Sequence, residues 1–189
     1  GNSGTTAEGG ETAGSSGVED GVLTVGMECT YAPYNWTQSD DSNGAVAIRG
    51  ASDYAYGYDV MMAKKIADAL GQNVQIVKLD WDSLIPAVMS GDVDCVIAGQ
   101  SITAERAAQV DFSNPYYYAS IVTLTKKDSA YANAASVADL AGATATSQLG
   151  TIWYDTCLPQ IENADLLAPA ETAPAMIMQL QTGSVDFIC

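Results

Sequence analysis

The segment 98–106 contains residue types that are suited to binding a carboxylate. It reads Ala-Gly-Gln-Ser-Ile-Thr-Ala-Glu-Arg and follows a β-branched run that predicts a strand. Gly99 has no Cβ, so a ligand can approach the backbone there, and Thr103 can cap a helix whose free amide groups favour negative charge. Arg106 lies early in that helix, and its planar guanidinium can hold a carboxylate through paired hydrogen bonds. The junction therefore predicts an anion site.

Arg106 is one of two arginines in the chain, so we expect its position to matter. The local residues leave a second interpretation equally open. In that interpretation, Arg106 pairs with Glu105 or Asp111 on the surface, where an ion pair contributes little stability. The two hypotheses differ in where the guanidinium lies.

Two other loops should lie at the same edge of the predicted sheet, because each directly follows a strand. They are 28–36 and 79–82. Open α/β sheets bind ligands at this edge, and Tyr31 and Trp81 are the natural pair of flat apolar walls around a small solute. Loop aromatics more often cover a core, so we expect Tyr34 or Trp36 to pack in that way and the other to face the site.

The charge balance and the missing residue types exclude several functions. The 189 residues include 23 acidic and 7 basic side chains, which gives a net charge of −16. Nucleic acids and anionic membrane surfaces bind clustered Lys and Arg, so we expect neither as a partner. The absence of histidine removes Ser/His/Asp and Cys/His pairs and His-ligated zinc. We therefore predict no catalytic residue, no metal and no cofactor.

The four cysteines are far apart in the sequence. They are Cys29, Cys95, Cys157 and Cys189. Their spacing is unlike that of a zinc knuckle or a redox CxxC motif, and the chain is apolar enough not to need a disulfide framework. We expect mostly buried thiols with one disulfide as an open alternative, whose pairing the sequence does not assign.

Short β-branched runs alternate with helical segments after residue 21, which is typical of a parallel α/β sheet. Strands are expected over 22–27, 74–79, 93–98, 121–125 and 143–146. Helices are expected over 59–70, 83–89, 152–157 and 174–181, with a helical turn over 136–140. Asp59 is the expected N-cap of the first helix, and Gly71 is its expected end.

Two further features concern the organisation of the chain. Residues 1–21 are rich in Gly, Ser and Thr and predict a flexible tether. The segment 89–97 (MSGDVDCVI) aligns with 181–189 (QTGSVDFIC), each with a helix end, a glycine and an acidic residue before a strand. Coincidence over such a short stretch is as good an explanation as homology, but a true repeat would indicate two lobes of related topology.

Together these segments resemble a known family. From residue 22 onward the chain is similar to the extracellular solute-binding proteins, family 3, of polar amino acid ABC transporters. The similar segments are 25–34 (VGMECTYAPY), 57–60 (GYDV), 81–86 (WDSLIP), 90–94 (SGDVD), 101–106 (SITAER), 111–117 (DFSNPYY) and 148–151 (QLGT). They occur in the order and spacing of the family, which makes the match more specific than any single motif.

The resemblance implies an α/β, two-lobed periplasmic-binding-protein-like fold. A parallel-sheet first lobe would occupy 22–117, and an incomplete second lobe would occupy 118–189. The segment 114–120 would be the first crossover, a hinge between lobes that close on a solute. The loop 38–56 is longer than in minimal family members, and we expect it to be a surface excursion.

The resemblance also implies how the main-chain end of an amino acid would bind. Arg106 would hold the α-carboxylate, helped by backbone amides near Ser101 and, from the second lobe, near Thr151. The Gly99 carbonyl would take part in binding the α-ammonium. Thr103 would act structurally by capping the helix that carries the arginine.

The other end of the ligand would meet different residues. By resemblance, Tyr31 and Trp81 would enclose the ligand side chain between their rings. Glu28 stands where an acid often meets the distal end of a basic or amide side chain. The expected ligand is thus a free amino acid that is polar or cationic.

The two ends of the chain compare differently with similar proteins, because the C-terminus departs from their pattern and the leader resembles one. In those proteins an aspartate that holds the ligand ammonium follows the strand that ends here at Cys189, and the chain then returns to the first lobe. We therefore expect this chain to be truncated, or completed by another chain. The leader resembles the tether after the lipidated cysteine of bacterial lipoproteins, which would lie just before Gly1. An extracellular or periplasmic protein, attached to the membrane only by a lipid tether, is expected.

The leading hypothesis is a binding protein that captures an amino acid and delivers it to the permease subunits of an ABC transporter. Two alternatives use the same scaffold. A dehydratase of cyclic, prephenate-like acids, or a module of a peptidoglycan-cleaving enzyme, would need an acid in the cleft, for which Glu28 is the only good candidate. A sensory ligand-binding domain would need a membrane helix, which the sequence does not contain.

Overall fold

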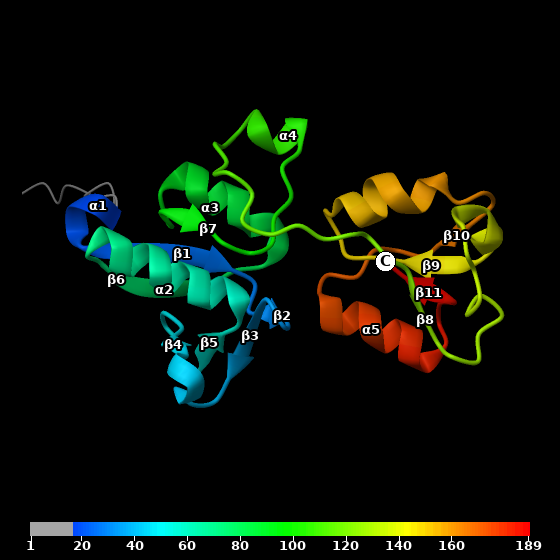
Figure 1. Ribbon diagram of the computed structural model, residues 1–189, viewed down its shortest axis with the longest axis horizontal. Helices are drawn as coiled ribbons and strands as arrows, with labels where there is room; N and C mark the ends of the chain where they lie inside the picture. The colour runs from blue at the N-terminus through cyan, green and yellow to red at the C-terminus, as the bar shows by residue number, and fades with distance from the viewer. Residues whose placement is uncertain (1–16) are drawn as a thin grey trace, which may run out of the picture.

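The computed structural model describes residues 17–189, which form two bodies joined by an extended segment (Figure 1). Residues 1–16 of the predicted tether lie outside the described residues. The tether stays a prediction, and its last residues include α1 (Gly17–Asp20), a short helix with acidic residues in its first turn, where they complement the helix dipole. The Asp20 carboxylate accepts a hydrogen bond from the Val22 amide at 2.8 Å, which connects α1 to the first strand.

The first lobe contains a parallel sheet with the strand order β6-β1-β7. Its strands are β1 (Val22–Met27), β6 (Asn73–Lys78) and β7 (Cys95–Val96), and its main helices are α2 (Tyr58–Leu70) and α3 (Leu84–Ser90). Val25, Met27, Ile76 and Leu84 are fully buried in the core that these elements share. β7 is shorter than the predicted strand 93–98, because only Cys95 and Val96 pair in register with β1, and the chain then turns at Gly99, where φ is 65°.

Helix α2 begins differently from the prediction, because Gly57 and not Asp59 is its N-cap. The φ of Gly57 is 126°, and a Cβ there would collide with the backbone of the preceding loop, so glycine is required. The Asp59 side chain is instead buried and accepts hydrogen bonds from Asn35 Nδ2 at 2.8 Å and from the Tyr116 hydroxyl at 3.4 Å. Burial raises the pKa of Asp59 to about 6, although both hydrogen bonds act to lower it.

A second, antiparallel sheet in the first lobe was not predicted. Its order is β2-β3-β5-β4, and its strands are β2 (Thr30–Tyr31), β3 (Asn35–Gln38), β4 (Val46–Ala47) and β5 (Tyr54–Tyr56). A short 3₁₀ helix, η1 (Ser42–Gly44), precedes β4. The prediction of a surface excursion over 38–56 is therefore wrong for β4 and β5. Ala55 is fully buried against the core of the first lobe.

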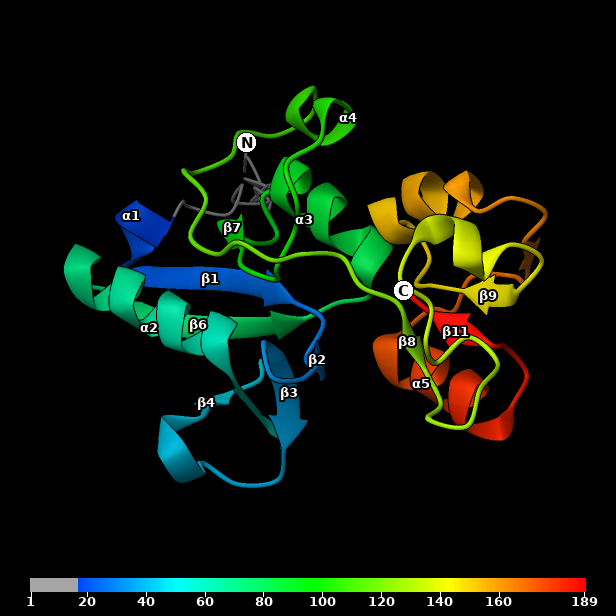
Figure 2. The same ribbon diagram turned by 45° about the vertical axis from the view of Figure 1, so that its right-hand side comes forward.

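The second lobe contains a four-stranded mixed sheet with the order β10-β9-β11-β8. Its strands are β8 (Leu124–Thr125), β9 (Thr144–Thr146), β10 (Asp165–Leu166) and β11 (Phe187–Ile188). Its helices are the 3₁₀ helix η3 (Val137–Leu140), the π-helix η4 (Trp153–Cys157), the 3₁₀ helix η5 (Leu158–Gln160) and α5 (Ala173–Thr182). α5 and the η4–η5 helices lie on opposite sides of this sheet (Figure 2). Strand β10 was not predicted.

The two similar sequence segments fold alike. In 89–97, α3 ends at Gly91 with a φ of 81°, and in 181–189, α5 ends at Gly183 with a φ of 80°. The following strand pairs in parallel with β1 in the first lobe and with β9 in the second. The related local topology that the alignment predicts is confirmed.

An aspartate completes each of these joints. Asp94 Oδ2 accepts a hydrogen bond from the Thr24 amide at 2.8 Å, and Asp186 Oδ2 accepts one from the Thr144 amide, also at 2.8 Å. Each carboxylate thus connects the start of its strand to the neighbouring parallel strand. The sequence similarity reflects a shared way of joining helix to sheet.

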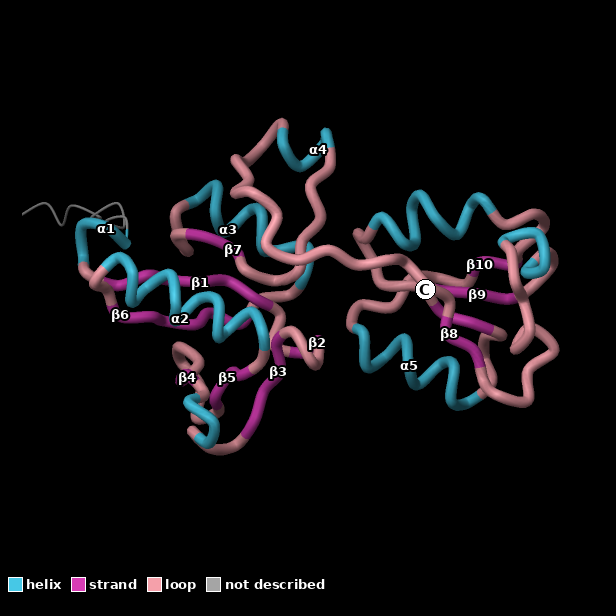
Figure 3. Tube along the Cα trace, in the orientation of Figure 1, coloured by secondary structure: helices cyan, strands magenta, loops and turns pink. Residues whose placement is uncertain are grey.

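A segment without helix or strand, 108–123, runs between the two bodies after α4 (Ala104–Ala107) (Figure 3). The Tyr58 hydroxyl donates to the Tyr116 carbonyl at 3.1 Å, and the two rings stack with centroids 6.3 Å apart. The predicted strand 121–125 is regular only in β8. The lobe boundary after residue 117 and the hinge at 114–120 stay predictions. Within the described part of the chain, no helix is long and apolar enough to cross a bilayer.

Candidate ligand-binding site

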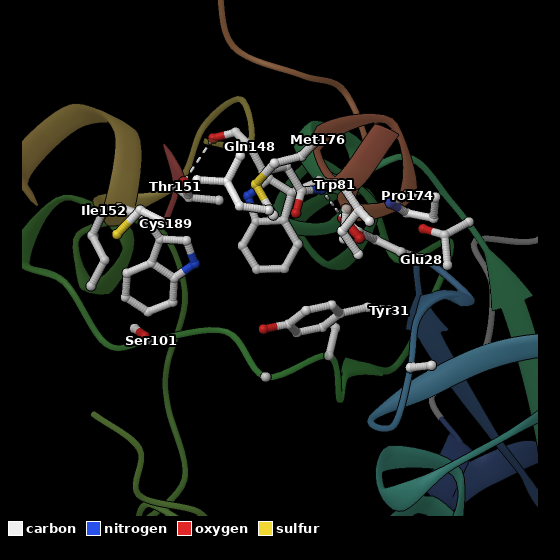
Figure 4. A pocket seen from close by; sticks show the side chains of 18 of the residues that line it. Glu28, Tyr31, Trp81, Ser101, Gln148, Thr151, Ile152, Pro174, Met176 and Cys189 are labelled. Atoms are coloured by element: carbon white, nitrogen blue, oxygen red, sulfur yellow. Dashed lines mark hydrogen bonds between the residues drawn. The ribbon is translucent and has the colours of Figure 1, made fainter. Parts of the chain in front are cut away.

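A cavity of about 480 Å³ lies between the two lobes. It is lined by all the residues that the sequence predicts to bind the ligand: Glu28, Tyr31, Trp81, Gly99, Ser101, Arg106 and Thr151. Figure 4 shows Glu28 on one side of the view and Ser101 and Thr151 on the other, with Tyr31 and Trp81 between them. The strand-end loops of the first lobe therefore meet at one place, and the second lobe contributes the opposite wall.

Arg106 projects from α4 into this cavity wall. Its Nη1 donates to the Ser101 carbonyl at 2.8 Å, and its Nη2 donates to the Gly150 carbonyl at 3.1 Å. The guanidinium carbon lies 5.5 Å from the centre of the Trp81 ring, within cation–π range. Burial lowers the pKa of Arg106, and the Glu105 and Asp155 carboxylates oppose that shift. The guanidinium stays charged, since its ordinary pKa is far above neutral pH.

The helix that carries Arg106 begins as the sequence predicts. Thr103 is the N-cap of α4, and its hydroxyl accepts a hydrogen bond from the Arg106 amide at 3.1 Å. Thr103 itself does not line the main cavity and has the structural role expected for it. The Gly99 amide donates to the Tyr116 hydroxyl at 3.3 Å, so the loop before α4 is also held to the inter-lobe segment.

Glu28 is the buried carboxylate of the cavity, with 6% of its surface exposed. Its Oε1 accepts a hydrogen bond at 2.7 Å from Nε2 of Gln148 in the second lobe. Burial raises the pKa of Glu28, the Gln148 hydrogen bond opposes this rise, and the Asp80 and Asp82 carboxylates add to it. The environment therefore disfavours the charged form of Glu28, and a cation at this end of the cavity would favour it.

The aromatic residues divide between the cavity and the packing around it. Tyr31 and Trp81 line the cavity, and the Trp81 Nε1 donates to the Gly150 carbonyl at 3.1 Å. Trp36 instead packs edge-on against Tyr56 with ring centroids 5.3 Å apart. Tyr34 does not line this cavity either, because its ring packs against Tyr31 and Tyr117 with centroids 5.0 and 5.4 Å apart. The expectation that Tyr34 or Trp36 packs is confirmed, and the expectation that the other one faces the site is wrong.

The second lobe approaches the site through the turn 148–151. Thr151 is buried, and its hydroxyl donates to the Gln148 carbonyl at 2.7 Å while accepting from the Tyr154 amide at 3.3 Å. Gly150 has a φ of 70°, and a Cβ there would collide with the Asp82 carboxylate of the first lobe. The positive φ favours glycine, and a larger residue there would have to displace the exposed Asp82 side chain.

A family model for bacterial extracellular solute-binding proteins, family 3, matches residues 23–146, which is more than half of the chain. The chain belongs to this family. The resemblance stated from the sequence motifs is confirmed. The solved structures described next confirm the two-lobed α/β fold as well.

Three similar proteins illustrate the family. The arginine-binding extracellular protein ArtP of Bacillus subtilis (strain 168) is 36% identical over 139 residues, which cover 72% of this chain and 48% of ArtP. The arginine-bound form of truncated ArgBP from T. maritima superposes with a TM-score of 0.75 at 30% identity, covering 91% of this chain and 74% of that one. The structure of AncCDT-1, an ancestral amino acid-binding protein and a precursor of cyclohexadienyl dehydratase, superposes with a TM-score of 0.77 at 31% identity. The match covers 91% of this chain and 70% of that one. This chain thus spans about half the length of ArtP.

The sequence does not predict most of the residues that line the cavity from the second lobe. Gln148 and Gly150, which make hydrogen bonds to first-lobe residues, were noticed only as part of a family motif. The remaining second-lobe wall is largely apolar and includes Ile152, Trp153, Pro174, Met176 and Ile188. No signal in the sequence separates these residues from an ordinary core. The ligand-binding roles of the seven predicted residues stay predictions.

The cavity has the chemistry of a binding site for a small zwitterion. A guanidinium, a buried carboxylate and aromatic rings all line it. Among residues 17–189, no group of three or more His, Cys, Asp or Glu side chains is placed to hold a metal ion. The arrangement can bind and enclose a solute through charge and apolar contact.

Proposed function

We propose that this chain captures an amino acid with a cationic side chain between its two lobes and delivers it to the permease subunits of an ABC transporter. The observation that carries the proposal is the shared lining of one inter-lobe cavity by Arg106, Glu28, Tyr31 and Trp81. Family membership supports the receptor role. The names of ArtP and ArgBP, both arginine-binding, support the ligand class.

In this proposal Arg106 binds the ligand α-carboxylate. Its two hydrogen bonds go to main-chain carbonyls, and a carboxylate is a stronger acceptor for a guanidinium than a neutral carbonyl. The amides near Ser101 and Thr151 complete the anion site, and the Gly99 carbonyl receives the α-ammonium. Closure of the lobes removes water around these charges, which strengthens each interaction.

The opposite end of the ligand meets Glu28. Its raised pKa means that the buried site disfavours the charged carboxylate, and the nearby Asp80 and Asp82 add further negative charge. A cationic side chain reverses both effects by pairing with Glu28 in a site of low dielectric. A neutral side chain does not, which is why we propose a cationic ligand within the broader polar class.

Calorimetric titration of the purified chain with arginine and with citrulline tests this proposal. Citrulline has nearly the shape of arginine without its charge. We expect arginine to bind at least tenfold more tightly, and Glu28→Gln to remove roughly 2–4 kcal/mol of arginine affinity while changing citrulline affinity little. Glu162→Gln, an exposed carboxylate outside the cavity, is the matched control.

Three outcomes would contradict the proposal. Failure to bind any amino acid would contradict the receptor role. Equal affinity for arginine and citrulline would contradict the preference for a cationic side chain. Recovery of a chemically altered ligand would favour the enzyme alternative, in which Glu28 acts as an acid. Recovery of unchanged ligand after tight binding supports a carrier.

We also propose that the protein is held at the outer face of the cell membrane by a lipid on a cysteine before Gly1. The extracellular location is that of the family. The Gly-, Ser- and Thr-rich composition of 1–16 supports a tether. Metabolic labelling of the full-length protein with a fatty-acid analogue tests this. Absence of label would contradict the tether and leave the binding proposal intact.

A further inference from the structure

Two cysteines that are far apart in the sequence approach the same part of the second lobe. Cys157 is the last residue of η4, and Cys189 follows β11. Side chains alternate along the end of β11: Phe187 packs into a core cluster with Leu158, whereas Ile188 packs in a different cluster with Leu180 of α5. Cys189 packs against the cluster of Phe187 and Leu158. Its side chain therefore faces the η4–η5 helices.

The surroundings of the two thiols confirm that they are neighbours. Both line one small cavity of about 220 Å³, together with Leu158 and Ile161. Burial raises the pKa of the Cys189 thiol to about 11, and negative charge on Cys157 contributes to that rise. Both residues are half-buried. The pair therefore shares a site that is partly exposed to solvent.

The backbone on the Cys189 side is already fixed. The Ser147 hydroxyl donates to the Cys189 carbonyl at 2.7 Å, and the Cys189 amide donates to the Thr146 carbonyl at 3.4 Å. Cys157 lies at the end of a π-helix, where the chain passes into η5. A link between the two would join the helical side of the second lobe to its central sheet.

We propose that Cys157 and Cys189 form a disulfide when the protein is in an oxidising extracellular environment. The structure holds both as thiols, which is the reduced form of the site. A low-molecular-mass disulfide such as oxidised glutathione supplies the oxidant. One thiolate attacks it to form a mixed disulfide and releases one glutathione. The second thiolate then displaces the other glutathione, so two protein thiols become one disulfide and two glutathione thiols are formed.

The link affects the ligand cavity as well as the fold. Thr151 and Ile152, just before η4, line the main cavity, and so does Cys189. The disulfide therefore fixes the second-lobe wall of the cavity from behind. It also closes a loop between positions 157 and 189 and so restricts the unfolded chain. This inference does not depend on which ligand the cavity binds.

Peptide mapping of the purified chain tests the proposal. The protein is incubated with oxidised glutathione, its remaining thiols are alkylated under denaturing conditions, and it is digested with a protease that cleaves after glutamate. Glu162 and Glu171 lie between the two cysteines, so the digest separates them unless they are linked. We expect one linked peptide pair, with Cys29 and Cys95 recovered in alkylated form.

Thermal unfolding gives a second, independent readout. We expect oxidation to raise the unfolding midpoint by about 10 °C, and dithiothreitol to reverse the rise. Cys157→Ser and Cys189→Ser should each abolish the rise, whereas Cys95→Ser, in the first lobe, should preserve it. Recovery of all four cysteines as alkylated thiols, a link to Cys29 or Cys95, or glutathione adducts alone would each overturn the proposal. If a variant fails to fold, the peptide map of the unmutated chain still shows whether Cys157 and Cys189 are linked.

Discussion

The two lobes bury different kinds of polar side chain, and some of these line the shared cavity. The buried polar residues of the first lobe are Glu28, Asn35 and Asp59, and those of the second lobe are Thr146, Ser147, Gln148 and Thr151. The first lobe therefore buries two carboxylates, whereas the buried polar groups of the second lobe are hydroxyls and an amide. The pKa of each buried carboxyl is raised by its burial.

This difference indicates a division of labour between lobes that share a local topology. Burying an ion costs far more than burying a hydrogen-bonded neutral group. A lobe that holds its charges permanently in place meets that cost once, when it folds. A lobe that closes over the ligand loses water from its wall at each closure, and a neutral, largely apolar wall keeps the cost of closure small. In the proposed function, the first lobe would recognise the ligand and the second lobe would enclose it.

The largest expected effect comes from removing the cation of the first lobe. Arg106→Ala should lower ligand affinity by roughly 2–5 kcal/mol, because the ligand carboxylate would be left unpaired in a closed cavity. Calorimetric titration measures the loss. Arg49→Ala removes the other arginine, which is exposed, and should leave affinity unchanged. Near-normal affinity of the Arg106→Ala variant would contradict the proposal that the first lobe recognises the ligand through this arginine.

The next effect concerns pH, and it should reside in the first lobe. The pKa of Asp59 is about 6 in the folded protein against an ordinary value of 3.8, so the folded state holds this proton more tightly. Its contribution to stability is therefore present at low pH and is lost as the pH rises from 3.8 to about 6. Between these pH values the free energy of unfolding of the Asp59→Asn variant should fall by roughly 2–3 kcal/mol less than that of the unmutated chain.

Urea unfolding measured across this pH range checks the prediction. Asp186→Asn, which alters a strand joint of the second lobe, is the comparison variant. It should lower stability by weakening the hydrogen bond to the Thr144 amide at that joint. An equal flattening of the profile in both variants would show that the pH dependence is not specific to the first lobe.

Much of the site could be predicted because its residues follow strands directly. Strand β1 leads into Glu28, and β7 leads into Gly99, so parallel pairing alone brings these two to one edge of the sheet. The helix cap at Thr103 is likewise a local feature. Local spacing therefore predicted the position of Arg106 on its helix, but it left open whether the guanidinium faces the cavity or the surface.

The remainder depends on contacts that no local pattern encodes. The antiparallel sheet of the first lobe has strands as short as two residues, such as β2 and β4, which carry little periodic signal. Asp59 has the residue type and position of a helix cap, but Asn35 and Tyr116, distant in the sequence, draw its carboxylate inward. The apolar second-lobe wall has the same composition as a core. Such features require the tertiary structure.

The closing role of the second lobe is tested at Gly150. Gly150→Ala places a Cβ against the Asp82 carboxylate, and Gly183→Ala is its matched control because its φ is similarly positive with nothing near the added atom. Both variants should lose about 1 kcal/mol of stability. Only Gly150→Ala should also weaken ligand binding, by roughly tenfold, since it pushes the lobes apart. Equal affinity of the two variants would show that closure tolerates the added group.

The smallest effect is expected at Thr151, where the second lobe contributes a neutral hydroxyl. Thr151→Val keeps the shape of the side chain but leaves the Gln148 carbonyl and the Tyr154 amide without their hydroxyl partner, which should cost about 1 kcal/mol of stability. Ligand should also dissociate a few times faster in stopped-flow measurements, because the turn that approaches the first lobe is less well held. Thr151→Ser retains the hydroxyl and should behave almost like the unmutated chain. If the serine variant is impaired as strongly as the valine variant, the methyl group matters more than the hydroxyl, and the second lobe encloses the ligand through apolar packing alone.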